Sequence, residues 1–355
     1  MSQFIATYAN TLLLVKQVNG RFHIEKKLEG MNAIAIAQDP FNPDILYCGT
    51  FDRGLWKSVD KGDSWLPIGT RFTYNSPFKK QDIPMTSITA VSVIDTGNNT
   101  GAVLVGTEPS ALFISYDQGD SFELLTDFAH IPGKEQWFFP PRPHTHHVKW
   151  LDNNHRSPNI ISLTIEAGGL IQSTDSGQHW EVPQTDHAPI DIHVLKSHDE
   201  HPNKLYGVLG DAFLNGGRDT FIESDDYGKT WTTFIDGIEH RYGYGLAINS
   251  NNAENIVIST SNSPMNAHSY GSHTFSTIYA IDKSQDNAWI EATEGLPSTN
   301  GTLISAVTER DGIFYIANNK GIFSSDNGGK SWHPLNITWP NELTEQHVYQ
   351  LITLD

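Results

Sequence analysis

Two short segments of the chain place metal-ligating and acid–base side chains two residues apart. One reads His144-Thr145-His146, and the other reads Asp191-Ile192-His193. Side chains two positions apart on a β-strand point to the same face, so each segment offers a pair of groups to one site. Imidazole and carboxylate groups suit Zn, Mn or Fe. The first hypothesis is therefore a divalent metal ion held by these four side chains: His144, His146, Asp191 and His193.

The same histidines also suit a site that transfers protons without a metal, because imidazole titrates near neutral pH. In this second hypothesis His146 or His193 is the general base, with Tyr242 or Glu108 as its partner. A hydrolase or lyase that acts on a small polar or carbohydrate-like molecule would fit such a site. Ligand-binding roles are expected for four further residues: Arg142, Arg241, Glu166 and Trp137.

A repeated eight-residue pattern, Ser-x-Asp-x-Gly-x-Ser/Thr-Trp, indicates the scaffold that positions these residues. Its copies are 58–65, 115–122, 173–180, 224–231 and 325–332, of which one has Phe for Trp, one has His for Ser/Thr and one has Asn for Asp. A worn copy without the glycine lies at 282–289. The glycine permits a positive φ, and the Ser and Asp side chains can bond nearby backbone amides. Each copy therefore predicts a tight turn, and the regular spacing predicts a repeat protein.

The pattern resembles the Asp-box, or BNR, repeat of sialidase-like β-propellers. The resemblance covers nearly the whole chain and implies that each box is a structural turn remote from the active site. The aspartates of the boxes are therefore expected to support folding: Asp60, Asp117, Asp175 and Asp226. The resemblance also raises a sialidase-type glycosidase as an alternative function. No arginines of this chain match the arginine triad of that family by motif, which counts against this alternative.

Around each turn the sequence alternates as four short strands do, here called A to D. In the first repeat they are 33–37, 45–50, 54–57 and 65–68. The N-terminal segments 4–8, 12–15 and 22–25 look like strands B, C and D, and the C-terminal segment 348–354 looks like strand A. Joining these segments would close a ring and hide two strand edges. The sequence thus predicts an all-β, seven-bladed propeller of four-stranded blades, with six blades as the alternative, in a single domain of residues 1–355.

Propeller topology puts the D–A and B–C loops on one face and the repeated turns on the other. The long loops 69–86, 126–145, 211–219 and 261–275 belong to the first face, so function is expected there. We expect the candidate site at the mouth of the central channel, with 261–275 as a flap over it. In the same reading His147 packs between blades, and His268 and His273 are solvated.

The composition indicates which classes of binding partner and which cellular compartment to expect. The net charge is −18, with 23 basic and 41 acidic residues, so binding to nucleic acid or to an anionic membrane is not expected. The N-terminus shows no signal-peptide pattern, no apolar run reaches the ~20 residues of a membrane helix, and Cys48 is the lone cysteine. These features predict a cytoplasmic protein. A non-catalytic scaffold that binds a protein partner stays open, because Trp137-Phe138-Phe139 is an apolar patch on the same face.

Overall fold

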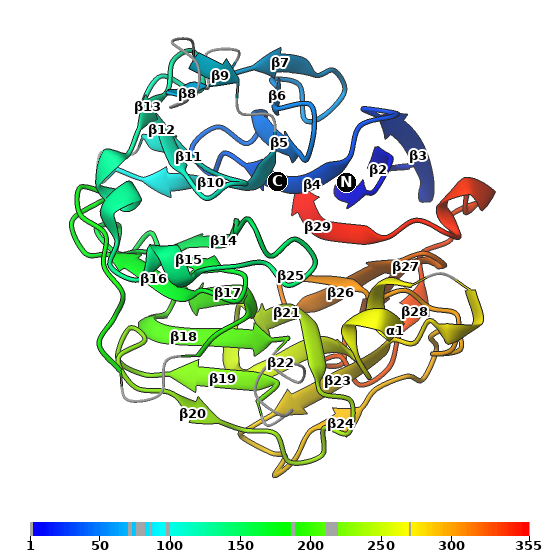
Figure 1. The fold of residues 1–355 in the computed structure, drawn as a ribbon. Helices are drawn as coiled ribbons and strands as arrows, with labels where there is room; N and C mark the ends of the chain where they lie inside the picture. The colour runs from blue at the N-terminus through cyan, green and yellow to red at the C-terminus, as the bar shows by residue number, and fades with distance from the viewer. Residues whose placement is uncertain are drawn as a thin grey trace.

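Seven antiparallel sheets form a ring around a central channel, which is the architecture of a seven-bladed β-propeller (Figure 1). The computed structural model describes residues 3–69, 73–75, 82–84, 87–96, 100–185, 189–210, 219–269 and 271–354. The first strand of each sheet contacts the first strand of the next, all the way around the ring. The predicted fold is confirmed, and the six-blade alternative is wrong.

The blades have the bounds that follow, each from its innermost strand outward. The first three repeats comprise β4 (Ala33–Gln38), β5 (Leu46–Thr50), β6 (Leu55–Ser58) and β7 (Leu66–Ile68); β10 (Ile88–Asp95), β11 (Gly101–Thr107), β12 (Leu112–Ser115) and β13 (Glu123–Leu124); β14 (Val148–Asn153), β15 (Ile161–Ile165) and β16 (Gly169–Ser173). In the third blade an isolated bridge between Gln172 and Glu181 stands in place of a fourth strand. The next three repeats comprise β17 (Ile192–His198), β18 (His201–Leu209), β19 (Phe221–Ser224) and β20 (Thr232–Thr233); β21 (Tyr242–Asn249), β22 (Asn252–Ser261), β23 (Thr277–Asp282) and β24 (Ile290–Glu291); β25 (Ala306–Arg310), β26 (Ile313–Asn318), β27 (Gly321–Ser325) and β28 (His333–Pro334).

Few other elements interrupt the blades. They are the hairpin of β8 (Thr73–Asn75) and β9 (Asp82–Pro84), the helix α1 (Pro264–His268), and the 3-10 turns Thr126–His130, Lys134–Gln136, Gly271–His273 and Asn341–Leu343. Most of loop 69–86, all but the last residue of loop 211–219, and residue 270 of the proposed flap lie outside the described residues. The described part of the flap contains α1 and the 3-10 turn Gly271–His273. Ser263 caps α1 by accepting a hydrogen bond from the backbone N–H of Asn266. Within the part of the chain that the structure describes, no helix is long and apolar enough to cross a bilayer.

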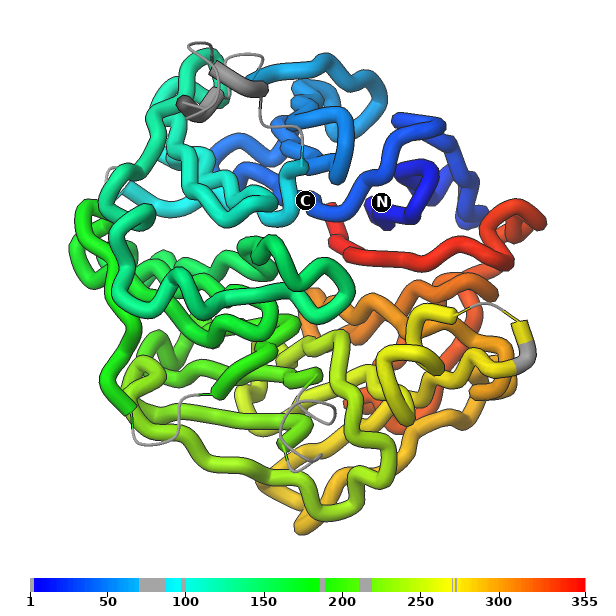
Figure 2. Tube along the Cα trace, in the orientation of Figure 1, coloured from blue at the N-terminus to red at the C-terminus, as the bar shows by residue number. Residues whose placement is uncertain are grey.

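The two chain ends close the ring by sharing one blade. The C-terminal β29 (Val348–Leu354) pairs antiparallel with β1 (Gln3–Tyr8), followed outward by β2 (Thr11–Val18) and β3 (Arg21–Lys27). The red C-terminal segment lies beside the blue N-terminal strands (Figure 2). Because the edge of β1 is covered by the far end of the same chain, ring closure ties every blade to its neighbours.

The repeated turns share one hydrogen-bond network. In the first four copies the serine Oγ donates to the aspartate Oδ1 at 2.7–2.9 Å and accepts from the glycine N–H at 2.7–2.8 Å. The same Oδ1 accepts from the backbone N–H four residues later at 2.8–2.9 Å. The glycines have φ between 85° and 94°, a region that other residues rarely adopt. The Ser and Asp side chains are therefore used within the turns.

Removing the closing strand should weaken the whole molecule. Deleting residues 348–354 would expose the edge of β1 and remove the buried side chains of Val348, Leu351 and Leu354. At ~1.5–3 kcal/mol for each buried aliphatic side chain, we expect a loss of about 5 kcal/mol or more. Thermal unfolding followed by circular dichroism checks this. A truncated protein with the melting temperature of the full chain would show that β29 does not close the ring.

One turn aspartate offers a test of the repeated network. Burial opposes the charge of Asp175, but hydrogen bonds from His179 and Ser173 outweigh it and lower its pKa to about 2. Asp175→Ala should cost about 1–2 kcal/mol at pH 7, the usual range for a lost polar cap. Because the folded pKa is depressed, this contribution is present above the unfolded pKa of Asp and lost as pH falls toward 2. The difference between variant and wild type should therefore shrink in acid.

The matched control for that variant is Asp326→Ala, in the fifth turn, whose side chain is exposed next to Asn327. Chemical denaturation at pH 7 and at pH 2–3 should show the pH-dependent loss for Asp175→Ala and little change for Asp326→Ala. Equal effects of the two substitutions would contradict a specific role for the turn aspartate.

Candidate functional site

The central channel holds a cavity of about 920 Å³ that is lined by the first strands of all seven blades. Charged and aromatic side chains gather in it. They include Glu108, Arg142, His147, Lys149, Glu166, Asp191, His193, Tyr242, Tyr244, His268 and His347. Convergence of titratable groups in one cavity makes it the candidate functional site.

A repeated irregularity of the innermost strands aims these side chains inward. Six of the seven first strands carry one extra residue relative to the strand they pair with, close to the start of the strand. The extra residues are Ile34, Thr89, Lys149, His193, Tyr244 and Tyr349, and every one lines the cavity. Two positions earlier in the chain, five more residues line it: Asn32, His147, Asp191, Tyr242 and His347. Such β-bulges re-aim side chains and are frequent beside active sites.

Three carboxylates in the cavity each face a cationic or imidazole group. The guanidinium of Arg142 donates two hydrogen bonds to Glu108, at 2.8 and 2.7 Å. The Lys149 Nζ lies 2.9 Å from Glu166 Oε2, and the His147 Nε2 lies 3.0 Å from the same oxygen. The His193 Nε2 lies 3.5 Å from Asp191 Oδ1. Pairing of this kind is what makes burial of several charges tolerable.

Glu166 is held in its charged form. Its side chain is 13% exposed, and burial by itself would favour the neutral carboxyl. The Lys149 ammonium and the hydrogen bond from His147 outweigh burial and keep the pKa of Glu166 well below its usual range. The pairs therefore present a carboxylate, not a carboxylic acid, to the cavity.

His193 is held in a fixed orientation with one nitrogen directed at the carboxylates. Its ring nitrogen Nδ1 lies 2.7 Å from the carbonyl oxygen of Gly243, which can only accept, so Nδ1 carries a proton. The other nitrogen, Nε2, faces Asp191. Burial opposes the charged ring, but the Asp191 carboxylate outweighs it and raises the pKa of His193. His193 is thus favoured in its protonated form beside the Asp191 carboxylate, and this proton-loaded pair lies opposite Glu166.

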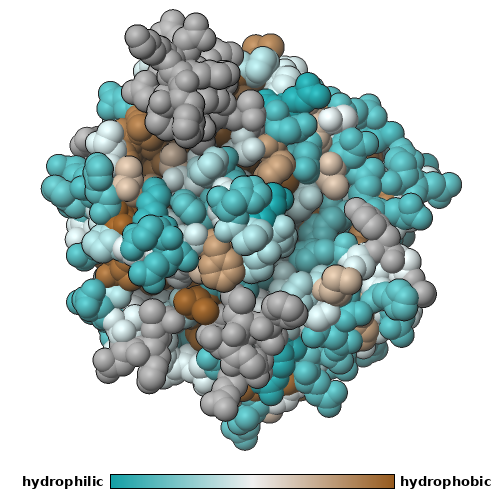
Figure 3. Space-filling view, viewed as in Figure 1, coloured by the Kyte–Doolittle hydropathy of each residue, from teal (hydrophilic) through white to brown (hydrophobic). Residues whose placement is uncertain are grey.

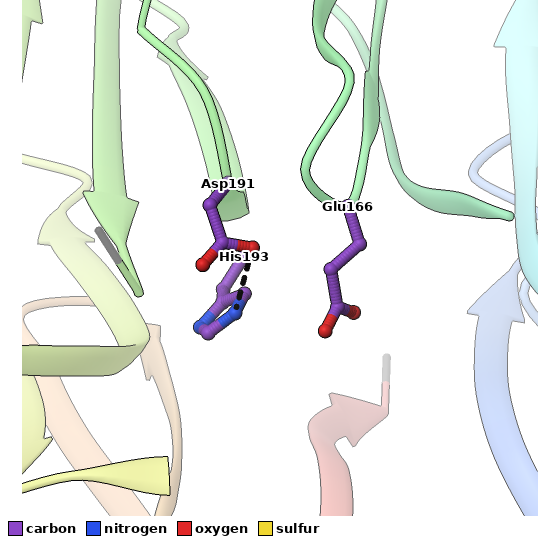
Figure 4. A group of neighbouring side chains, drawn as sticks. All are labelled: Glu166, Asp191 and His193. Atoms are coloured by element: carbon purple, nitrogen blue, oxygen red, sulfur yellow. Dashed lines mark ion pairs between the residues drawn. The ribbon is translucent and has the colours of Figure 1, made fainter. Parts of the chain in front are cut away.

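Figure 4 shows these groups together: Asp191 stands just before β17, His193 follows within it, and Glu166 reaches in from the turn after β15. One ligand atom of each lies within 4.8 Å of the others. Two backbone features support the arrangement. Asp191 has a φ of 57°, in the left-handed region, and the neighbouring Gly210 leaves no room for a Cβ beside His193.

The structure brings together only part of the set expected from sequence. Asp191, His193, Glu108, Glu166, Tyr242 and Arg142 all line the cavity. His144 and His146 do not: His144 is exposed, and the His146 ring packs edge-on against Trp137. Trp137, predicted to bind a ligand, packs against a core cluster and is also absent from the cavity lining. Arg241 is likewise absent from the cavity lining. The predicted four-ligand group is therefore split, and Arg142 is committed to Glu108.

The group is split because the predicted inward face of β14 was off by one residue. The turns that end the innermost strands differ in length, so the end of a strand does not show which alternate residues face the channel. The bulge at Lys149 sets the inward face, and it points His147 and Lys149 into the cavity. A one-residue shift moves every side chain to the opposite face. The expectation that His147 packs between blades is therefore wrong, and the ring lies against Glu166.

Two further histidines escaped sequence reasoning. His268 ends α1 and His347 precedes β29, and both line the cavity. His268 was expected in solvent, yet its Nε2 lies 3.0 Å from the Tyr242 hydroxyl and its Nδ1 lies 2.7 Å from His347 Nε2. A signal for His347 existed in the sequence: His347-Val348-Tyr349 opens an innermost strand just as Asp191-Ile192-His193 does.

The donor atoms of Glu166, Asp191 and His193 are grouped closely enough to hold a metal ion, and the Nδ1 contact of His193 with a backbone carbonyl is the pattern that orients metal-ligating histidines. The Lys149 ammonium, 2.9 Å from Glu166, opposes a dication there. The two carboxylates of this cluster are already paired, Glu166 with Lys149 and Asp191 with His193.

Gly210 provides a test of the His193–Asp191 pair. A Cβ at this position would lie 2.5 Å from His193 Cε1 and 2.6 Å from Asp191 Oδ2. Gly210→Ala should separate the pair and lower the pKa of His193, because the carboxylate that raises it moves away. Titration of the histidine ring protons by NMR measures this pKa. Asp191→Asn should shift it in the same direction, and an unchanged pKa in both variants would show that Asp191 does not charge His193.

Comparison with known proteins gives a fold and no family. No family model matches the chain, and no curated protein matches its sequence. Among solved structures the chain is similar to the GH74 enzyme of Niastella koreensis, with a TM-score of 0.63 and 16% identity over 93% of this chain and 51% of that one. It is also similar to an ancestral GH74 enzyme, with a TM-score of 0.60 and 16% identity over 90% of this chain and 38% of that one. YCF48 bound to a D1 peptide is similar at a TM-score of 0.52 and 13% identity, over 89% and 84% of the two chains. The chain spans about half or less of the GH74 structures, and at these identities the similarity establishes the propeller fold alone.

Proposed function

We propose that the protein is an acid–base enzyme that cleaves a small polar or carbohydrate-like molecule in the channel cavity, as a hydrolase or lyase. The observation that carries the proposal is the juxtaposition of a charged carboxylate, Glu166, with the proton-loaded His193–Asp191 pair, all within 4.8 Å. Environments that drive two titratable groups toward opposite charge states are the mark of an acid and its partner. The fold similarity to two GH74 enzymes supports a carbohydrate as the ligand class.

The proton inventory of a hydrolytic step follows from these positions. His193 donates the Nε2 proton to the leaving oxygen as the bond to carbon breaks, and the Glu166 carboxylate stabilises the positive charge that develops on that carbon. Water then adds to the carbon, and its proton returns to Nε2 of His193. Asp191 stabilises the charged imidazole, and the Gly243 carbonyl fixes the ring orientation. His147 and Lys149 keep Glu166 ionised.

We further propose that the five turns are Asp-box repeats, because their Ser–Asp–Gly network recurs unchanged in four copies. A sialidase-type activity is not favoured: among the described residues that line the cavity, Arg142 is the single arginine, and Glu108 occupies it. Cytoplasmic location and a single-domain chain remain predictions.

A divalent metal is the second candidate for this site, supported by the close grouping of Glu166, Asp191 and His193. Zn, Mn or Fe held there would activate water in place of the His193 proton. Elemental analysis of the purified protein separates the two: about one metal ion per chain, lost in Glu166→Gln, would favour the metal, and its absence together with chelator-resistant turnover would favour acid–base chemistry.

A non-catalytic scaffold is the third candidate. A binding face for a protein partner should be apolar, whereas the face in Figure 3 is largely hydrophilic where it is coloured, with apolar residues in small separate groups. Phe138 is 38% exposed, and YCF48 is a propeller solved with a peptide. The charge pairs inside the channel favour the enzyme over this candidate.

Substitutions in the cavity test the enzyme proposal. A panel of p-nitrophenyl glycosides serves to find a turned-over probe, and Glu166→Gln and His193→Gln should each lower kcat on it by about 100-fold or more. The matched control is His146→Gln, since His146 lies outside the cavity lining. Equal activity of all three variants would refute the assignment of the site.

The pH dependence of the rate provides a separate check. The pKa of His193 is raised and that of Glu166 is lowered, so both groups are in their working forms between these two values. The rate should fall as pH rises through the raised pKa of His193 and should hold in mild acid. A rate that instead rises steadily above pH 7 would show that His193 works as a base.

A further inference from the structure

A chain of three hydrogen-bonded side chains lies beside His193. The Tyr242 hydroxyl lies 3.0 Å from His268 Nε2, and His268 Nδ1 lies 2.7 Å from His347 Nε2. The three residues come from β21, α1 and the residue before β29, so the fold brings them together from distant parts of the sequence. The Tyr242 ring stands edge-on to His193 at 5.2 Å between ring centroids.

Both imidazoles of this chain are neutral. Burial lowers the pKa of His347 to about 3, with Lys149 adding to the effect and the Val348 backbone opposing it. Burial, together with His347 and Lys149, places the pKa of His268 well below its usual range. Burial and the carboxylates of Glu166 and Asp191 raise the pKa of Tyr242 well above its usual value, so the phenol keeps its proton.

A neutral imidazole has one N–H and one lone pair, so the chain can be directed in only two ways. In one, Tyr242 donates to His268, His268 donates through Nδ1 to His347, and His347 carries its proton on Nδ1. In the other, His347 donates through Nε2 to His268, His268 donates through Nε2 to the Tyr242 oxygen, and the His347 Nδ1 carries a lone pair.

The far end of the chain decides between the two directions. The His347 Nδ1 is buried, and no described group of the protein meets hydrogen-bond geometry with it. The Val348 backbone has the smallest influence on the pKa of this ring and does not offset burial. A buried N–H without a partner is rarer and more costly than an unpaired acceptor. The second direction is therefore favoured, because it leaves a lone pair and not a proton at Nδ1.

We propose that His268 and His347 are positioning residues that make Tyr242 a dedicated hydrogen-bond donor to the ligand. In this arrangement the Tyr242 oxygen accepts from His268, and its own proton is free to point into the cavity that the residue lines. This inference rests on the proposed function and adds to it the chemistry of the recognised group.

The consequence is a preference for a ligand oxygen that accepts hydrogen bonds. The rings of Tyr242 and His193 lie 5.2 Å apart between centroids, and both residues line the cavity, so each can offer a donor to a ligand there. Two donors that converge on one oxygen stabilise negative charge developing there, as in a leaving alkoxide or an enolate. A glycosidic, ring or carbonyl oxygen fits this pair, whereas a ligand ammonium does not.

Histidine tautomers test the proposal without any substrate. Long-range ¹H–¹⁵N spectra of the ¹⁵N-labelled full chain at pH 7 should show His268 and His347 each protonated at Nε2. Protonation of His268 at Nδ1 would reverse the chain and overturn the proposal, as would a charged imidazolium at either residue. The result does not depend on turnover, so failure of the proposed function leaves this test intact.

A pair of tyrosine substitutions provides the matched control. Tyr242→Phe removes the acceptor at the end of the chain and should shift the tautomer populations of both histidines, although Tyr242 is hydrogen-bonded only to the nearer one. Tyr244 contacts both rings, at 5.3 and 5.4 Å, without a hydrogen bond in the chain. Tyr244→Phe should leave both tautomers unchanged, and an equal response to the two substitutions would contradict a directed chain.

Turnover measures the consequence for the ligand. On whichever p-nitrophenyl glycoside the enzyme cleaves, Tyr242→Phe should lower kcat about tenfold, the scale of one lost hydrogen bond, with KM nearly unchanged. His347→Leu should lower kcat similarly in the wild-type background and add nothing to Tyr242→Phe, because the histidines act through that hydroxyl. Full additivity of the two losses would show that His347 acts independently of Tyr242.

Discussion

The extra residue near the start of the innermost strands is the constraint on which the site depends. A regular strand would send alternate side chains into the channel and the others between blades. The bulge breaks this alternation at the same level in six blades and sends Lys149, His193 and Tyr244 inward. The residues two positions earlier then reach the same cavity. Strand register thus decides which side chains line the channel. Because β29 closes the ring, the six strands with a bulge stay aligned with one another.

Charge pairing is the second condition of the site, because the channel excludes much of the water that would otherwise screen its groups. Each carboxylate has a partner, and the three pairs differ in use. Arg142 lies 4.8 Å from the Phe51 ring centroid and 4.7 Å from that of Phe139 while it holds Glu108, which makes that pair a rigid wall of the cavity. Glu166 with Lys149 and Asp191 with His193 face each other across the space where a ligand would lie. Removing one member would leave a buried charge unpaired, which costs more than the pair contributes.

Much of the fold was predictable from the sequence, because short local motifs determine it. The Ser-x-Asp-x-Gly turns fix the repeat, and the orphan strands at the two ends imply ring closure. The site was predictable only in part. Asp191 and His193 were found because they lie two positions apart at the start of one innermost strand, and Tyr242 because it starts the innermost strand of the next blade. His147 was missed because the turns that end the innermost strands differ in length, so no local pattern marks which of His146 and His147 faces the channel. His268 was missed because a polar loop segment gives no sign that it folds back over the channel as α1.

A crystal structure with a bound ligand would test the central claim most directly. Crystals of the Glu166→Gln variant, soaked with a saccharide that the wild type cleaves, would trap the ligand before reaction. The account predicts a ligand in the channel cavity, with one of its acceptor oxygens within hydrogen-bond distance of both His193 Nε2 and Tyr242 Oη, and with the scissile carbon facing residue 166. A ligand bound on the outer faces of the blades, or in the channel but remote from His193, would contradict it.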